Sequence, residues 1–214
     1  MQIKERMIKD LYTITKDENI NKAIDIMSAH DLHRLPVVEN KKLVGLLTKG
    51  MISQKGASKA TSLSIFELNY LLSKTSVSTI MEKNVITVNE NQLLEEAAQL
   101  MLSNDIGCLP VINEQEELVG ILTQNDLFKA FMDLLGYNDL GSRVSIKVKD
   151  GLGVLEEVTK IFTDNNCNIS HLGVYDLEDG YKNIIFRTSA EETTSLAKDL
   201  EGKGYKVLSI INNN

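Results

Sequence analysis

Residues 35–48 read LPVVENKKLVGLLT, and residues 109–123 read LPVINEQEELVGILT. The two stretches match along their length once one residue is inserted near Gln115, and both prolines of the chain stand at the same position in them. The match extends outward over residues 7–52 and 81–127, with a shift of 74 positions that becomes 75 after the insertion. Self-similarity on this scale is typical of a repeated structural unit.

Both copies predict the same order of elements. Apolar residues at i, i+3, i+4 and i+7 mark one face of an amphipathic helix, and two short runs rich in Val and Ile predict a pair of strands. A second helix follows, so each copy predicts a β-α-β-β-α unit. Because a unit of about 50 residues buries little apolar surface alone, we expect the copies to pack together, with ligand clefts between them. The helix faces are Ile20, Ala23, Ile24 and Met27 in one copy and Leu94, Ala97, Ala98 and Met101 in the other.

These patterns resemble known regulatory modules. The doubled unit, with its Leu-Pro-Val and Gly-x-Leu-Thr stretches, resembles a tandem pair of CBS motifs, and residues 143–211 resemble a βαββαβ ACT domain. The order CBS–CBS–ACT, with Ser64-Ile65-Phe66 between the copies, is similar to the acetoin-utilisation AcuB family. The expected fold class is therefore α/β (α+β), a CBS pair followed by a ferredoxin-like domain.

The predicted domain boundaries follow from these patterns. We expect CBS repeat 1 over residues 1–55, a linker with a short helix over 56–79, and CBS repeat 2 over 80–135. A hinge over 136–142 then leads to the ACT domain at 143–214.

Composition excludes several classes of function. A net charge of −7, from 23 basic and 30 acidic residues, argues against a nucleic-acid partner. No stretch approaches the roughly 18 apolar residues that would span a membrane, so we expect a cytoplasmic protein. Two distant cysteines, Cys108 and Cys167, predict reduced thiols with packing roles. Three histidines without a metal spacing, and no nucleophile motif, predict neither a metal site nor an enzyme.

The strongest candidate site is at Thr123 and Asp126. Thr123 ends a strand and caps a helix, whose first N–H groups make a natural phosphate site. Asp126 can accept hydrogen bonds from two ribose hydroxyls, but Thr-x-x-Asp also fits a capping box. The resemblance to CBS proteins favours the ligand interpretation. Repeat 1 has Met51 where repeat 2 has Asp126, so we expect one good nucleotide site per chain.

The remaining contacts to the nucleotide are drawn from both repeats. His33 and Arg34 precede the Leu-Pro of repeat 1, and the resemblance implies that such basic residues contact phosphates, which an Arg fork suits. A solvated pair at the start of a strand is the alternative. The base is expected between two segments of repeat 2, Val85-Ile86-Thr87 and Cys108-Leu109-Pro110.

The ACT domain adds a weaker candidate. The family usually shows Asp-x-Pro-Gly where this chain has Asp150-Gly151-Leu152-Gly153, so its proline is replaced. Amino-acid-binding members use this loop, here Asp150 and Gly153, and residues near Asn168. Pairing of ACT domains without a ligand is the alternative.

The sequence thus predicts a non-catalytic regulatory protein. The leading hypothesis is a sensor of an adenine nucleotide (AMP, ADP or ATP, with S-adenosylmethionine or NAD left open) that acts on an unidentified protein partner in acetoin or carbon metabolism, or on its own assembly. A dimerising scaffold with empty clefts and an amino-acid-responsive regulator are the alternatives. Because an exposed ACT sheet is costly, we expect a homodimer.

Overall fold

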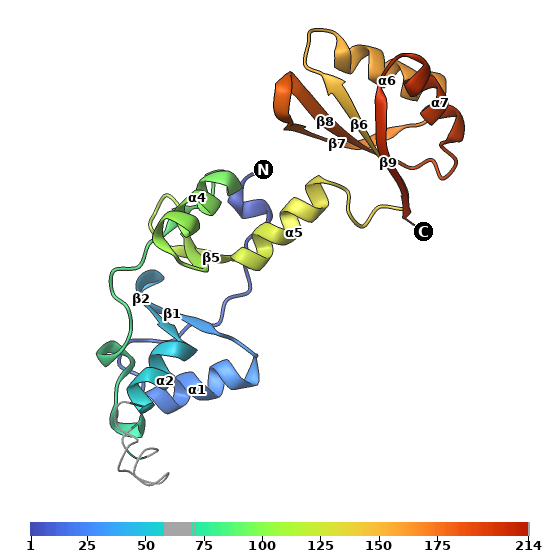
Figure 1. Ribbon diagram of the computed structural model, residues 1–214. Coiled ribbons are helices and arrows are strands. Elements are labelled where there is room, and N and C mark those ends of the chain that lie inside the picture. Colours follow the sequence, from blue (N-terminus) through green and yellow to red (C-terminus); the bar gives the residue numbers. More distant parts are fainter. Residues whose placement is uncertain (58–69, 71, 214) are drawn as a thin grey trace. The chain divides into compact units, whose positions relative to one another are not determined.

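The computed structural model describes residues 1–57, 70 and 72–213. They form two compact units, Met1–Leu127 and Phe128–Asn214 (Figure 1). The linker residues Ser64-Ile65-Phe66 and most of the short helix expected between the repeats lie outside the described residues, although Tyr70 and residues 72–74 are helical. None of the helices in the described part of the chain is long and apolar enough to cross a membrane.

The first repeat has the predicted helix and strand pair. Asn19 caps the first helix by accepting a hydrogen bond from the Lys22 backbone N–H (2.9 Å), and Ile14 adds a parallel bridge to Val37. Ile20, Ala23 and Met27 of the predicted apolar face are buried. The elements are α1 (Ile20–Ala29), β1 (Arg34–Glu39), β2 (Lys42–Thr48) and α2 (Lys49–Ala57), with β1 and β2 antiparallel.

The second repeat reproduces the backbone of the first in detail. Val88 pairs in parallel with Val111. These two residues lie 74 positions after Ile14 and Val37, which form the matching bridge in repeat 1. The bulge after Val37 recurs after Val111. The repeat predicted from the sequence is therefore also a structural repeat. Its elements are β3 (Val88–Asn89), α4 (Leu94–Asn104), β4 (Cys108–Ile112), β5 (Leu118–Thr123) and α5 (Gln124–Leu134).

The segment that leads into each repeat forms backbone hydrogen bonds with the other repeat. The 3₁₀ turn η1 (Ile3–Glu5) precedes repeat 1, but the Ile3 N–H donates to Gln92 O (3.0 Å) in repeat 2. The matching turn η2 (Val77–Thr79) precedes repeat 2, and the Val77 N–H donates to Glu18 O (2.8 Å) in repeat 1. The exchange is reciprocal, so neither repeat has its backbone hydrogen bonds satisfied alone.

Two glycines make this exchange possible. A Cβ on Gly45 would lie 2.6 Å from Met81 Sδ and 2.9 Å from Glu82 O, and a Cβ on Gly120 would overlap Met7 Sδ. Further bridges join Ile8 to Ile121 and Leu46 to Glu82. The glycine of each Gly-x-Leu-Thr stretch is thus explained by the close approach of the other repeat's leading segment.

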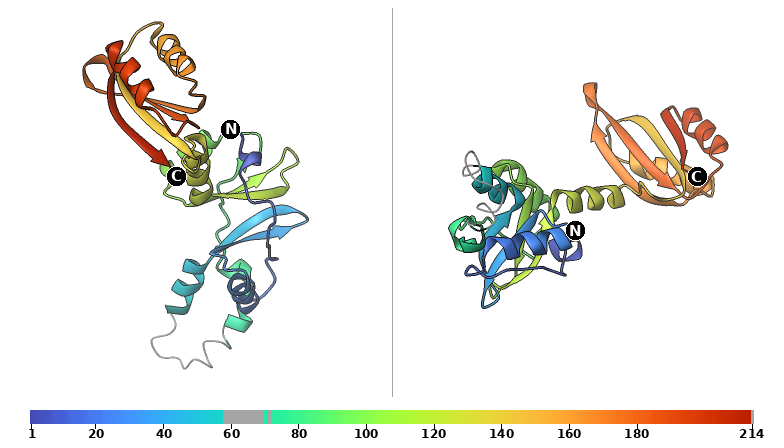
Figure 2. Two further views of the ribbon diagram at one scale, coloured as in Figure 1. Left: turned by 90° about the vertical axis from the view of Figure 1, so that its right-hand side faces the viewer. Right: turned by 90° about the horizontal axis from the view of Figure 1, so that it is seen from below.

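The second unit has the βαββαβ order that the sequence predicts. Its antiparallel sheet has the strand order β7-β8-β6-β9, and both helices cover one face (Figure 2). The core between the sheet and the helices includes Val144, Ile146 and Phe186 from the strands and Phe162 from a helix. The elements are β6 (Gly141–Lys149), α6 (Val154–Asp164), β7 (Ile169–Asp176), η3 (Glu178–Gly180), β8 (Tyr181–Thr188), α7 (Thr194–Gly202) and β9 (Lys206–Asn213).

The start of the second helix in this unit is stabilised by a side chain that lies outside the helix. The helix α7 begins at Thr194. The Glu192 carboxylate accepts a hydrogen bond from the Thr194 N–H (2.8 Å). Glu192 therefore serves the start of the helix from outside it.

The exchange between repeats predicts a large effect of one methyl group. Gly120→Ala should lower the free energy of unfolding by about 1–3 kcal/mol, the usual cost of overpacking, because the new Cβ overlaps Met7 Sδ and lies 3.1 Å from Ile8 O. Urea denaturation measures the loss, and adding Met7→Ala should recover part of it.

Gly50→Ala is the matched control in the same unit. Its new Cβ would meet nothing closer than Thr48 Oγ1 at 3.7 Å, and alanine favours the helix by about 0.5–1 kcal/mol. Equal denaturation midpoints for Gly120→Ala and Gly50→Ala would contradict the tight packing between repeats.

Candidate functional site

The junction of β5 and α5 holds Thr123 and Asp126 against each other. Asp126 Oδ2 accepts hydrogen bonds from the Thr123 N–H (2.9 Å) and the Thr123 hydroxyl (2.6 Å). The Asp126 N–H donates in return to Thr123 Oγ1 (3.4 Å). Asp126 is only 9% exposed. The capping box that the sequence suggested is therefore present.

The cap engages only one oxygen of the Asp126 carboxylate. Both donors from Thr123 meet Oδ2. Every fully buried side-chain nitrogen or oxygen in the described residues has a hydrogen-bond partner, so Oδ1, which has none, reaches solvent. The cap and a ligand role are therefore compatible, since the cap fixes the carboxylate with one acceptor open.

Repeat 1 has no carboxylate at the matching place. Thr48 Oγ1 accepts a hydrogen bond from the Met51 N–H (3.2 Å), so the helix start is capped in the same way. The thioether of Met51 offers only a weak acceptor. The two strand–helix junctions therefore share a backbone conformation but differ in the group they offer a ligand, a carboxylate in repeat 2 and a thioether in repeat 1.

Arg34 reaches from repeat 1 to the junction of repeat 2. A Cβ built on Gly107 would lie 2.6 Å from Arg34 Nη2 and 3.5 Å from Gln124 Oε1, so the guanidinium fills the space that Gly107 leaves. Burial raises the pKa of the Cys108 thiol, and the charge of Arg34 partly opposes that rise. The guanidinium meets no carboxylate among residues 1–57, 70 and 72–213. A cation with no counter-ion among these described residues therefore stands beside the Thr123 junction.

His33 lies differently from its neighbour Arg34. It is exposed, and its backbone carbonyl accepts a hydrogen bond from the Lys49 N–H (3.0 Å) at the start of α2. This hydrogen bond of His33 lies within its own repeat, whereas the Arg34 side chain approaches the other repeat.

The two segments expected around a base are neighbours in space. Residues 85–87 are half-buried and lead directly into β3, which pairs in parallel with β4 from Val88 and Val111 onward. Val85-Ile86-Thr87 and Cys108-Leu109-Pro110 thus immediately precede the two residues, Val88 and Val111, at which the parallel pairing begins. The three residues of β4 are buried.

One feature near this region was missed from the sequence. The rings of Tyr12 and His30 stack with their centroids 3.7 Å apart. The repeat shift of 74 places Tyr12 on Ile86, so comparison of the two copies could have drawn attention to an aromatic ring at a base-side position of repeat 1.

The candidate ligand-binding residues of the ACT domain lie far apart within one chain. Asp150 follows β6 and donates its N–H to Gly180 O (3.0 Å), while Gly153 has φ +81° before α6. Asn168 precedes β7 and is exposed. The register places Lys149 opposite Tyr181 and Ile169 opposite Thr188, at the two ends of β8. At about 3.4 Å per residue these ends are roughly 24 Å apart.

The cysteines and metal-ligand residue types form no reactive cluster in the described part of the chain. Cys108 and Cys167 are free and buried, and burial raises the pKa of both thiols. Among the described residues, no three His, Cys, Asp or Glu side chains are grouped to hold a metal ion. The chemistry of the Thr123 junction is thus that of hydrogen bonds and charge.

Comparison with known families agrees with this organisation. The CBS domain matches residues 3–55 and 77–133, and the ACT domain matches residues 142–203. CBS and ACT domains are regulatory modules.

Two curated relatives each match about three fifths of the chain. The uncharacterized protein MJ1225 of Methanocaldococcus jannaschii is 33% identical over 138 residues, which are 62% of this chain and 49% of that protein. The inosine-5'-monophosphate dehydrogenase of the same organism is 32% identical over 127 residues, or 58% of this chain and 22% of the enzyme. The chain thus spans about half of one relative and far less of the other.

Two solved structures share the CBS-pair fold. A putative acetoin utilization protein (AcuB) from Vibrio cholerae is 27% identical with a TM-score of 0.54, and the likeness covers 64% of this chain and 95% of that one. The CBS domain pair of protein MJ0100, in complex with 5-methylthioadenosine and S-adenosyl-L-methionine, is 26% identical with a TM-score of 0.51 and covers 61% and 99%.

The cap geometry predicts how Asp126 contributes to stability. Asp126→Ala should lower the free energy of unfolding by about 1 kcal/mol, the typical value for loss of a helix cap. Asp126→Asn keeps an amide oxygen for the two Thr123 donors, so it should lose less. Urea denaturation midpoints of the two variants check this order, and a larger loss for the asparagine variant would contradict it.

Proposed function

The chain belongs to the CBS-domain family and carries an ACT domain behind its CBS pair, and on this basis we propose that it is a regulatory protein that binds an adenine nucleotide at the Thr123 junction. The observation that carries the proposal is the open Oδ1 of Asp126 at the start of α5, where the Arg34 guanidinium of the other repeat approaches Gly107 and Gln124. A site of this kind signals by binding and requires no catalytic step.

The chemistry of the junction matches the three parts of a nucleotide. The carboxylate of Asp126 offers an acceptor to a ribose hydroxyl, and the first turn of α5 with Arg34 suits phosphate. The adjacent segments 85–87 and 108–110 offer backbone groups and apolar surface to a base. The related MJ0100 pair was solved with two adenosine compounds, which supports an adenosine ligand. Within that class we propose a phosphorylated ligand, AMP, ADP or ATP, because Arg34 has no counter-ion in the part of the chain that the structure describes.

The first binding prediction concerns stoichiometry. Titration calorimetry with AMP, ADP and ATP should show one site per chain for the ligand that binds best. Asp126→Asn should weaken binding by about 1–3 kcal/mol, because the ribose loses a charged acceptor. At 100 times its dissociation constant the ligand should stabilise the fold by about 2.7 kcal/mol.

Met51→Ala is the control at the matching position of repeat 1 and should bind as the unmodified chain does. Two equal sites, or normal binding by Asp126→Asn, would contradict the asymmetric site. Absence of any thermal shift with adenine compounds would instead favour a scaffold whose clefts stay empty.

The second binding prediction separates phosphate from ribose recognition. Arg34→Ala should weaken binding of the nucleotide much more than binding of adenosine, because only the phosphate contact is removed. Lys22→Ala, which removes an exposed cation from α1, is the charge-matched control. Equal losses for nucleotide and nucleoside would assign Arg34 a packing role.

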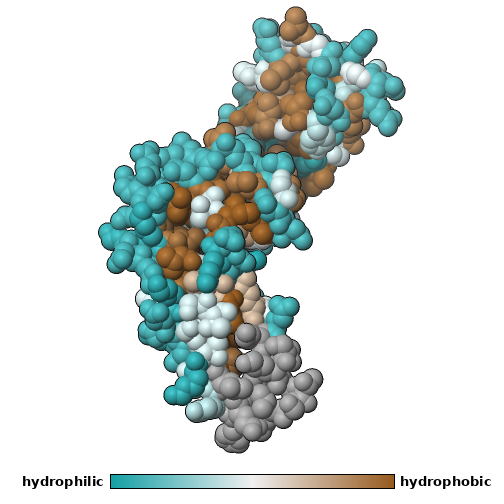
Figure 3. Space-filling view, turned by 90° about the vertical axis from the view of Figure 1, so that its left-hand side faces the viewer, coloured by the Kyte–Doolittle hydropathy of each residue, from teal (hydrophilic) through white to brown (hydrophobic). Residues whose placement is uncertain are grey.

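We also propose that the protein assembles as a homodimer. Apolar side chains are exposed on both units (Figure 3), and on the edge strand β7 they include Leu172 and Val174, which are 40% and 48% exposed. An edge strand with apolar side chains is a pairing surface. Sedimentation equilibrium should show a dimer at micromolar concentration, and Val174→Lys should shift it toward monomer. A monomeric unmodified chain would contradict this proposal.

The likeness to the Vibrio cholerae protein supports a narrower proposal, that the regulated partner acts in acetoin metabolism. Growth on acetoin of a strain that lacks this protein would test it.

A further inference from the structure

The second unit contains two arginines, Arg143 and Arg187, whose charges no residue in the described part of the chain neutralises. Arg143 on β6 and Arg187 on β8 stand directly opposite each other in the register, so both point away from the helices. Like charges in such a pair destabilise a sheet. Arg187 is nevertheless buried, with only 8% of its surface exposed.

Two other cations on these strands have partners, and Lys149 at the end of β6 is exposed to solvent. Lys147 lies over the ring of Tyr181 (4.1 Å), and Lys182 pairs with Asp176 (2.6 Å) and Asp150 (3.5 Å). Neither Arg143 nor Arg187 has a carboxylate or a hydrogen-bond acceptor for its guanidinium among the described residues. The contrast marks the two arginines as an unbalanced pair rather than a general property of the sheet.

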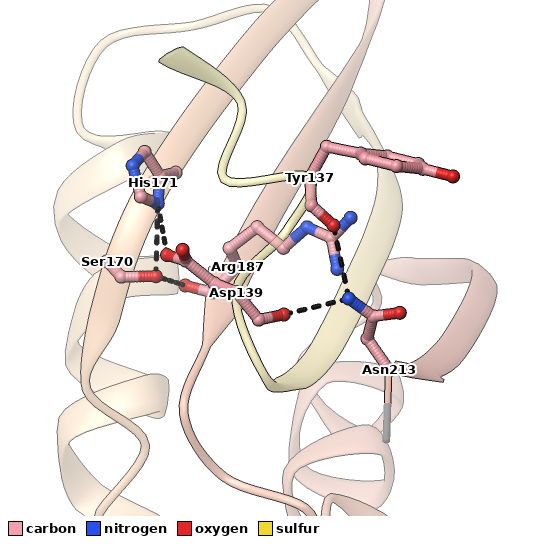
Figure 4. A network of polar contacts seen from close by, with 6 residues as sticks. All are labelled: Tyr137, Asp139, Ser170, His171, Arg187 and Asn213. Atoms are coloured by element: carbon pink, nitrogen blue, oxygen red, sulfur yellow. Dashed lines mark hydrogen bonds and ion pairs between the residues drawn. The ribbon is translucent and has the colours of Figure 1, made fainter. Parts of the chain in front are cut away.

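A short strap, defined as residues 135–140, lies over this end of the sheet. Leu135 packs on Gly173, and the ring of His171 lies against Gly136. Asn213 Nδ2 holds the strap by donating to Tyr137 O (3.1 Å) and Asp139 O (2.9 Å). Figure 4 shows Arg187 beneath the strap, between Tyr137 and Asp139.

The strap's own carboxylate does not balance Arg187. Asp139 Oδ2 lies 3.2 Å from His171 Nδ1 instead (Figure 4). Every fully buried side-chain nitrogen or oxygen in the described residues has a hydrogen-bond partner, so the guanidinium nitrogens of Arg187, which have none, still reach solvent. A buried guanidinium without a partner is costly, and here it remains accessible to a ligand.

We propose that Arg143 and Arg187 bind a small metabolite through a carboxylate or phosphate group beneath the strap. Two guanidinium forks on neighbouring strands match the paired oxygens of such an anion. The site is separate from the Asp150–Gly153 loop, because Arg143 and Arg187 lie at the other end of β8. It is equally separate in sequence from the Thr123 junction, so it does not rest on the proposed nucleotide function.

Titration of the full chain with inorganic phosphate and, separately, with succinate tests the site. The comparison shows whether the two arginines bind a phosphate group or a carboxylate. The titrations use the Arg34→Ala chain at constant ionic strength, so that phosphate binding at the CBS pair does not interfere. NMR of the arginine Nε–Hε groups reports binding. We expect saturable shifts of the Arg143 and Arg187 signals with at least one anion, and at least tenfold weaker binding in Arg187→Gln, which corresponds to about 1.4 kcal/mol.

Controls keep the outcome clear. Lys149→Gln removes the same charge from an exposed position on β6 and should leave the affinity unchanged. If Arg187→Gln fails to fold, Arg143→Gln, at a half-buried position, carries the same test and should also weaken binding tenfold. Absence of saturable binding below about 10 mM of either anion, equal to a dissociation free energy of less than roughly 3 kcal/mol, would overturn the proposal. Equal affinities in the arginine and lysine variants would also overturn it.

Discussion

The reciprocal exchange of leading segments between the two repeats is the constraint on which the first unit depends. The Leu94 N–H of repeat 2 donates to Met1 O (3.1 Å), and the Ile20 N–H of repeat 1 donates to Thr75 O (3.0 Å). Each helix thus has a backbone partner from the segment that leads into the other copy. A single copy would leave these groups without their partners, so the pair is the smallest unit that satisfies its own hydrogen bonds.

The same pseudo-two-fold relation explains why the candidate site draws on both repeats. Arg34 and Cys108 occupy matching positions in the two copies, yet the charge of Arg34 acts on the Cys108 thiol. Matching positions meet only near the axis that relates the copies, and Lys42 bridges to its own counterpart Glu117 there as well. Sequence divergence then makes the two halves unequal. Arg34 of repeat 1 fits the space beside Gly107 of repeat 2. At the matching positions of the other half, repeat 2 has the short side chain of Cys108 and repeat 1 has His33 in place of a glycine.

Much of the fold could be predicted because it is periodic. The helix faces, the strand pairs and the βαββαβ order repeat patterns that burial imposes on the sequence. The exchange of leading segments between the repeats could not be predicted from periodicity, because its hydrogen bonds join backbone atoms. In the sequence it is indicated only by Gly45 and Gly120. The Thr123–Asp126 pair was found, but whether it caps or binds depended on which carboxylate oxygen the cap uses. Arg187 was missed because an arginine on a strand normally indicates a solvent-facing position, and the strap that buries it is distant in sequence.

The boundary between the two units falls at Leu127 and Phe128, inside α5. Domain boundaries usually lie in flexible linkers, whereas here an unbroken helix of 11 residues crosses from one unit to the next. Asp126 lies in its first turn, and its last residue, Leu134, leads directly into the strap over Arg187. At 1.5 Å per residue the helix is about 16 Å long, and its backbone hydrogen bonds resist bending within that length. Asp126 and the strap are therefore joined by one short run of helix rather than by a loop. The order of the elements along the chain thus explains why the residues of one candidate site are followed so closely by the segment that covers the other.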